Sequence, residues 1–243
     1  MRGYGASENE LPQLNPNECV AIRDTLSEYL GREEYVSSSK LRSAYSSFKR
    51  RNKEISRSSI LGAIFHRLVL EEPDDFNLGM TEITNGWTDH RLSQFDLQNI
   101  KGARNQLNQW SNKLFCDWVS LGDVETSIYW KDESGSSWRA RPDIITEDFV
   151  IDLKTFSGKN QKRFLKNRDR NGFLIQAGHY LDGLKYLHHR SFNFGFLCID
   201  LTKPFRIQLD ILEEPQLVRA EELLSEAKEA YIKGFRGVPR QHP

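Results

Sequence analysis

Cysteine is scarce and scattered in this chain of 243 residues. Its three cysteines, Cys19, Cys116 and Cys198, lie far apart, and none forms a Cys-x-x-Cys pair or a Cys/His cluster. Zinc and iron–sulfur sites need such groups of ligands, so we expect neither a zinc site nor an iron–sulfur cluster. The scattered cysteines also favour a reducing compartment, where disulfides are rare.

An excess of charge of either sign is absent as well. The 34 basic side chains equal the 34 acidic ones, which gives a formal net charge of zero. A neutral chain has no overall field that draws it to nucleic acid or to a membrane surface. Any such partner must therefore be bound by local patches.

Long apolar runs are missing too. No segment approaches the roughly 18 apolar residues that a membrane-spanning helix needs. The opening residues, MRGYGASENELPQLNPNE, lack the basic and then apolar pattern of a secretion signal. We therefore expect a soluble cytoplasmic protein without a membrane partner.

The pattern of apolar residues predicts one domain with both helices and strands. The first fifteen residues are polar and turn-rich, so we expect a flexible arm over 1–15 and a single domain over 16–243. Helices are predicted over 15–31, 37–52, 56–72, 93–120, 159–170, 172–187 and 214–235. Three short strands forming a meander are predicted within 123–155, and two more over 192–201 and 205–212. This order indicates a mixed α/β (α+β) fold, with a central mixed sheet of about five strands flanked by helices.

The segment RPDIITEDFVIDLKT, residues 141–155, carries charged side chains in an otherwise apolar run. On a strand, Asp152 and Lys154 share one face with Val150, while the opposite, apolar face is expected to turn to the core. Residues two apart on a strand are separated by about 6.6 Å, which leaves room for a metal ion or water between the two charges. A short turn would also bring Asp143 alongside Asp152, where a divalent cation would relieve the repulsion between the carboxylates.

An isolated Asp-x-Lys in a strand has a simpler explanation, since it is most often a solvated pair at a sheet edge, and Asp143 can cap a turn. The arrangement of Pro142, Asp143, Asp152 and Lys154, however, resembles the motif of the PD-(D/E)xK nuclease superfamily. More of the chain is similar to its branch of RecE-like exonucleases (the exonuclease VIII C-terminal domain), including phage-encoded relatives, and more distantly to lambda exonuclease and the RecB nuclease domain. The stretches that carry the resemblance are VSSSKLRSAYSS, LGAIFHRLVLEEPDDF, VETSIYWKDESGSSWRARPDIITEDFVIDLKT and FLIQAGHYLDGL. The resemblance implies a restriction-endonuclease-like core.

The resemblance also implies a metal centre with Mg²⁺ or Mn²⁺, expected as two ions. One ion is expected on Asp143, Asp152 and the carbonyl of Leu153, and the second on Asp143 and His66. Lys154 is expected to orient or deprotonate the attacking water. A lone histidine on an apolar helix is more often a core or surface residue, so His66 is assigned to the metal only through the resemblance.

Three further residues are assigned to the active site. Gln176 and Tyr180 match the Gln-x-x-x-Tyr motif of the RecB-like branch, and residues four apart on a helix share a face. Glu125 alternates with apolar neighbours in VETSIYW, so it either points to the same cluster or is solvated, and both possibilities stay open. His179, His188 and His189 have no carboxylates at ligand spacing. They are therefore expected at the surface, without a second metal site.

Basic residues on both sides of the motif are expected to bind the DNA backbone. The residues assigned to DNA binding are Lys49, Arg50, Arg51, Arg139, Arg141, Lys159, Lys162, Arg163 and Lys166. A run of basic residues is ordinarily a solvated face, so its position beside the active site decides its role.

The resemblance implies a metal-dependent exonuclease that degrades double-stranded DNA from its ends. It implies 5′ to 3′ polarity and 5′-phosphate products, and a role in recombination or phage DNA metabolism. A homo-oligomer that encloses DNA and a single-strand annealing protein as partner are expected on the same ground. Two alternatives stay open: a structure- or sequence-specific endonuclease, and a DNA-binding module without catalytic activity.

Overall fold

Two sheets organise the computed structural model, which describes residues 11–45, 57–71, 93–156 and 172–236. Five strands form a mixed sheet in the order β2-β5-β6-β7-β8, and three form a smaller antiparallel sheet in the order β1-β3-β4. The strands are β1 (Cys19–Ile22), β2 (Asp123–Val124), β3 (Ser127–Lys131), β4 (Ser137–Ala140), β5 (Ile144–Ile145), β6 (Phe149–Phe156), β7 (Asn193–Asp200) and β8 (Ile207–Ile211). In the larger sheet only β6 and β7 pair in parallel. The predicted fold class, a mixed α/β fold with a five-stranded mixed sheet, is confirmed.

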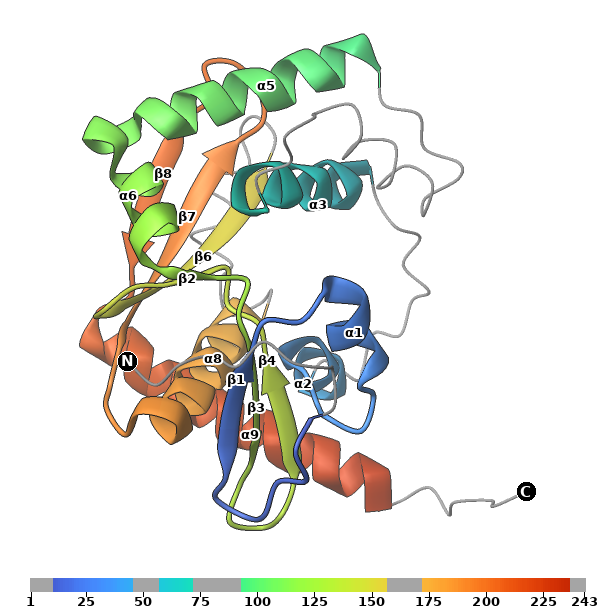
Figure 1. Ribbon diagram of the computed structural model, residues 1–243. Coiled ribbons are helices and arrows are strands. Elements are labelled where there is room, and N and C mark those ends of the chain that lie inside the picture. The colour runs from blue at the N-terminus through green and yellow to red at the C-terminus, as the bar shows by residue number, and fades with distance from the viewer. Residues whose placement is uncertain (1–10, 46–56, 72–92, 157–171, 237–243) are drawn as a thin grey trace.

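Helices cover both faces of the five-stranded sheet (Figure 1). The helices are α1 (Leu26–Gly31), α2 (Ser38–Tyr45), α3 (Arg57–Leu70), α5 (Gln94–Gln109), the 3-10 turn η1 (Trp110–Lys113), α6 (Leu114–Leu121), α8 (Phe173–His188) and α9 (Glu214–Arg236). One core layer lies between the sheet and α3, α5 and α6, and a second lies between the sheet and α8, α9 and the three-stranded sheet. Within the described ranges, no helix has the length and apolarity to cross a bilayer.

Strand β6 is buried on both of its faces. Ile151 and Leu153 pack in the layer under α3 and α5, as the alternation predicts. On the other face, Val150 is fully buried in the layer under α8 and Asp152 is 1% exposed. The charged side chains of β6 therefore lie inside the protein, where unpaired charge is costly.

The prediction of one helix over 15–31 was wrong. Cys19–Ile22 form β1, which pairs with β3, and α1 begins only after Thr25, whose side chain and that of Glu28 form a capping box. Within the predicted arm over 1–15, Leu14 is 5% exposed and packs in a cluster with Tyr29, Tyr35 and Tyr129. Residues 1–10 lie outside the described ranges.

The helix predicted over 93–120 is divided into α5 and α6. Ser111, Asn112 and Lys113 have positive φ angles of 48°, 57° and 70°, which no continuous α-helix accommodates. The helices predicted over 56–72, 172–187 and 214–235 are confirmed by α3, α8 and α9, whereas the helix predicted over 159–170 lies outside the described ranges.

The strands predicted as one meander belong to two different sheets. β3 and β4 form a hairpin in the three-stranded sheet, whereas β2, β5 and β6 are neighbours in the five-stranded sheet. From β2 to β5 the chain therefore passes between the sheets twice, at Glu125–Thr126 and at Arg141–Asp143. Both crossings carry residues of the candidate site.

Gly62 allows α3 to pack closely on β6. A Cβ at this position would lie 2.6 Å from Oγ1 of Thr155, and His66 follows one turn later on the same helical face. We expect Gly62→Ala to lower the free energy of unfolding by about 1–3 kcal/mol because the helix must shift. The same shift should weaken metal binding at His66, measured by calorimetry with Mn²⁺. Gly234→Ala is the control, since a Cβ there meets nothing within 4 Å and should stabilise α9 by up to about 1 kcal/mol.

Candidate active site

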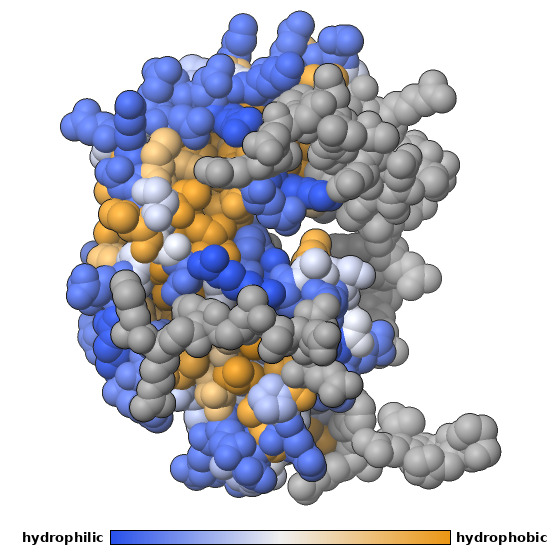
Figure 2. All heavy atoms as spheres, viewed as in Figure 1, coloured by the Kyte–Doolittle hydropathy of each residue, from blue (hydrophilic) through white to orange (hydrophobic). Residues whose placement is uncertain are grey.

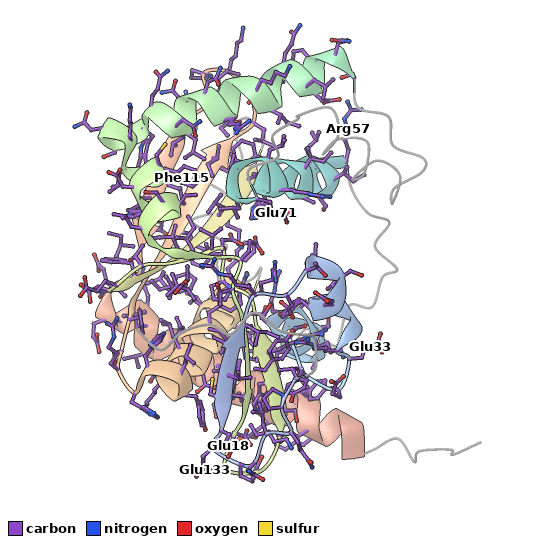
Figure 3. The ribbon with its side chains drawn as sticks, viewed as in Figure 1. Glu18, Glu33, Arg57, Glu71, Phe115 and Glu133 are labelled. Carbon is purple, nitrogen blue, oxygen red and sulfur yellow. The ribbon has the colours of Figure 1, made fainter. Side chains whose placement is uncertain are left out.

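Three potential metal ligands meet where the chain crosses between the sheets. One ligand atom from each of His66, Glu125 and Asp143 lies within 4.8 Å of the other two. Nδ1 of His66 is 3.6 Å from Oδ2 of Asp143, and the same oxygen accepts a hydrogen bond from the backbone N–H of Leu153 at 2.6 Å. His66 lies on α3, between Arg57 and Glu71, which mark the two ends of that helix in Figure 3. The space-filling view shows a hollow between α3 and α1 (Figure 2).

Glu125 reaches this cluster through an unusual backbone conformation. Its φ angle is 49°, in the left-handed region that residues other than glycine rarely adopt. Its backbone N–H donates to the carbonyl of Asp143 at 3.1 Å, so the two crossings are joined. In the sequence, the direction of the Glu125 side chain was inferred from strand alternation. Alternation does not apply here, because Glu125 lies between β2 and β3.

Asp152 lies next to this cluster and is paired differently from what the sequence predicted. Since Ile144 pairs with Ile151, continuation of the antiparallel register places Asp143 opposite Asp152. The predicted gap between Asp152 and Lys154 is absent, because Nζ of Lys154 contacts Oδ2 of Asp152 directly. The ammonium group lies beside the rings of Phe173 and Phe196, 5.1 Å and 5.8 Å from their centroids.

Gln176 and Tyr180 hold the other side of Asp152. Nε2 of Gln176 donates to Oδ1 of Asp152 at 2.9 Å and lies 2.9 Å from the hydroxyl oxygen of Tyr180. Gln176 and Tyr180 are 8% and 7% exposed, so both act from inside the protein. The predicted shared helical face is therefore observed, and it is directed at the carboxylate of Asp152.

Burial and mutual repulsion raise the pKa of two carboxyl groups in the site. Burial, with repulsion from Asp143, raises the pKa of Glu125 to about 7, against the opposing effect of Arg141. Burial also raises the pKa of Asp152 to about 6, although Lys154 partly offsets it. The pKa of Asp143 is lowered because His66, Lys154 and the N–H of Leu153 outweigh its burial. The site thus concentrates negative charge that a cation would stabilise.

Two arginines assigned to DNA binding are buried, which corrects their roles. Arg139 is 3% exposed, and its guanidinium donates to the carbonyls of Tyr29 and Arg32. The side chain of Arg141 is 9% exposed and is paired with Glu125 and Asp24. Both guanidinium groups are buried inside the protein, so neither faces a DNA backbone. The remaining residues assigned to DNA binding, Lys49, Arg50, Arg51, Lys159, Lys162, Arg163 and Lys166, lie outside the described ranges.

Arg42 is a candidate that the sequence did not single out. Its guanidinium lies 5.1 Å from the ring centroid of Phe173, the same ring that Lys154 approaches. Burial lowers the pKa of Arg42, while Asp152 and Tyr180 oppose this effect, so the side chain lies near the site. In the sequence, Arg42 is one of several basic residues in its segment, and nothing in the pattern distinguishes it from the others.

His179 is buried, although a surface position was expected. Its Nε2 lies 2.9 Å from the carbonyl of Arg139, and its ring packs between Trp130 and Trp138. Burial lowers the pKa of His179 to about 4, so the ring is neutral at pH 7 and belongs to the core.

Comparisons with known proteins identify the family and the fold of the chain. The model of a family described as a PDDEXK-like domain of unknown function (DUF3799) matches residues 44–233. The chain belongs to this PDDEXK-like family. A solved structure of a presumed exonuclease from Eubacterium rectale is similar over 89% of this chain and 88% of that chain, with a TM-score of 0.69 and 13% identity. At that identity the likeness shows the fold. No curated protein matches the chain.

The ligands of this PDDEXK-like site suit a hard divalent cation. His66, Glu125 and Asp143 offer two carboxylates and an imidazole, a set that binds Mg²⁺ or Mn²⁺ better than soft metals. The raised pKa of Glu125 supports this fit, because a bound cation would favour its ionised form. Leu153 contributes its N–H to Asp143, and its carbonyl remains a predicted ligand.

Proposed function

We propose that the protein is a metal-dependent deoxyribonuclease that hydrolyses phosphodiester bonds at the ends of double-stranded DNA. The observation that carries the proposal is the meeting of His66, Glu125 and Asp143, with the ion pair of Asp152 and Lys154 beside it. Membership of the PDDEXK-like family supports a nuclease. The proposal includes two divalent ions in the active site, either Mg²⁺ or Mn²⁺.

The side chains around the cluster have separate roles in the proposed reaction. When bound, the divalent ion supplies positive charge that stabilises the reacting phosphate and promotes ionisation of water. Lys154 orients or helps to deprotonate the attacking water and stabilises negative charge near Asp152. Gln176, supported by Tyr180, keeps Asp152 in place through its hydrogen bond. No covalent intermediate with the protein is required.

Arg42 supplies a second positive charge for the substrate in this proposal. It lies with Lys154 around the ring of Phe173, and an arginine can bind a phosphate through two parallel hydrogen bonds. Arg42 is therefore proposed to bind a phosphate next to the one that is cleaved.

An exonuclease is preferred over an endonuclease on two grounds. The motifs resemble RecE-like exonucleases, and the structurally similar protein from Eubacterium rectale is named as a presumed exonuclease. A 5′ to 3′ polarity, 5′-phosphate products, a ring-shaped homo-oligomer and an annealing protein as partner are proposed from the same resemblance.

Digestion of end-labelled linear DNA and covalently closed circular DNA tests the proposal. With Mg²⁺ or Mn²⁺ the protein should degrade the linear DNA and leave the circle intact, and EDTA should stop the reaction. Substrates with nuclease-resistant linkages at only the 5′ or only the 3′ ends give the polarity. Nicking of the circle would indicate an endonuclease, and binding without cleavage of either DNA would contradict an enzymatic role.

A further inference from the structure

A buried network of charged groups joins the N-terminal segment to Glu125. Arg141 donates from Nε to Oε2 of Glu125 at 2.6 Å, and from Nη1 to Oδ1 and the carbonyl of Asp24 at 2.9 Å and 2.8 Å. Asp24 lies between β1 and α1, 117 positions before Arg141 in the chain. One guanidinium thus connects a candidate metal ligand to a distant carboxylate.

Asp24 is itself held firmly. Its side chain is 1% exposed and pairs with Arg32 at 3.1 Å, and it accepts hydrogen bonds from the hydroxyls of Ser127 and Tyr129. A buried carboxylate that is held by this many donors has little freedom to move. Asp24 therefore fixes one end of Arg141.

The other end of Arg141 fixes Glu125 in a position that the backbone alone does not favour. The hydrogen bond from Arg141 reaches Oε2 of Glu125, so Oε1 can face the cluster with His66 and Asp143. The left-handed φ of 49° shows that this residue is held against its conformational preference. Carboxylates that bind metals are usually oriented in this way by a hydrogen-bonding neighbour.

We propose that Arg141, anchored by Asp24, is a positioning residue that directs Glu125 toward the divalent cation. The segment 19–32, outside residues 44–233 that the family model matches, then completes the metal site. This inference rests on the metal centre of the proposed function. Asp24 and Arg141 thus raise the affinity for the metal by positioning Glu125, and neither contacts the metal.

Calorimetric titration with Mn²⁺ tests this role without any need for catalysis. Asp24→Asn removes the negative charge that anchors Arg141, and we expect Mn²⁺ affinity to fall about 10-fold to 100-fold. Asp123→Asn is the control for removing the charge of one aspartate, because Asp123 also pairs with an arginine, Arg23, at 3.3 Å, although its side chain is 34% exposed compared with 1% for Asp24. The control should bind Mn²⁺ like the wild-type protein.

Arg141→Lys provides the second variant, which keeps the positive charge inside the protein. An ammonium group cannot bridge Glu125 and Asp24 as the planar guanidinium does, so the same loss of affinity is expected. Because its charge balance is unchanged, this variant tests the inference even where Asp24→Asn fails to fold. Wild-type affinity in folded Arg141→Lys would overturn the inference.

A double-mutant cycle with Glu125→Gln shows whether the effect passes through Glu125. Once Glu125 is replaced, Arg141→Lys should change Mn²⁺ affinity by no more than about twofold, because the two substitutions remove one interaction. Additive losses would contradict positioning and indicate a general structural effect. Absence of Mn²⁺ binding in the wild-type protein would overturn the metal centre itself, which distinguishes failure of the proposed function from failure of this inference alone.

Discussion

Replacing Asp143 by asparagine should lower the rate of DNA cleavage by at least about 10³-fold, the factor that corresponds to losing several kcal/mol of metal-derived stabilisation. Asp143 joins the cluster of His66 and Glu125 and lies opposite Asp152, so any cation in this site needs its charge. The asparagine oxygen can still accept the hydrogen bond from the N–H of Leu153, which preserves the local backbone. Calorimetry should accordingly show a folded protein with little or no Mn²⁺ binding.

Asp200→Asn is the matched control for this substitution. Asp200 is 3% exposed, and Oδ1 accepts hydrogen bonds from the backbone N–H and the hydroxyl of Thr202 at 2.9 Å and 2.7 Å. It lies at the end of β7 and is not a member of the metal cluster. Its substitution should leave cleavage and Mn²⁺ binding unchanged. Cleavage at the wild-type rate by the Asp143 variant would contradict the proposed site.

Local patterns were sufficient to predict the regular elements on which several candidate residues lie. The alternation around Asp152 and Lys154 predicted β6, and the apolar pattern over 172–187 predicted α8, which carries Gln176 and Tyr180. Both elements are long and strongly apolar, so local periodicity and tertiary packing favour the same structure. His66 was placed correctly on a helix for the same reason.

The direction of Glu125 could not be predicted in this way. Glu125 has a positive φ angle and lies where the chain crosses from one sheet to the other. No periodic pattern in the sequence specifies such a crossing. The strand β1 was predicted as helix because its four residues show no alternation that distinguishes them from a helical turn. Its conformation comes from pairing with β3, more than 100 positions later.

The arginines near the motif were misassigned for a related reason. Composition identifies Arg139 and Arg141 as basic, but their roles depend on carbonyls and carboxylates supplied by the segment 24–32. These contacts span more than 100 positions of the chain, so only the tertiary structure distinguishes a buried arginine from one that binds DNA.

Replacing Lys154 by methionine should lower the cleavage rate about 10²-fold to 10⁴-fold, as expected for loss of a group that acts in proton transfer. Methionine retains much of the apolar stem beside Phe173 and Phe196, so the fold should be kept. Asp152, which is 1% exposed, then keeps only its bond from Gln176, and its pKa should rise further above about 6. The activity that remains should therefore shift to higher pH.

Lys228→Met separates this catalytic effect from the loss of a partly buried ion pair. Nζ of Lys228 lies 2.8 Å from Asp182 and 4.6 Å from the ring centroid of Trp138, and its side chain is 19% exposed compared with 16% for Lys154. The two lysines thus match in partner, aromatic contact and burial, but Lys228 lies away from the metal cluster. Mn²⁺ and DNA binding should remain measurable in both variants, with a loss of cleavage in the Lys154 variant alone. Equal activity of the two variants would remove Lys154 from the mechanism. The ion pair of Lys154 with Asp152 would then contribute no more to cleavage than the ion pair of Lys228 with Asp182 does.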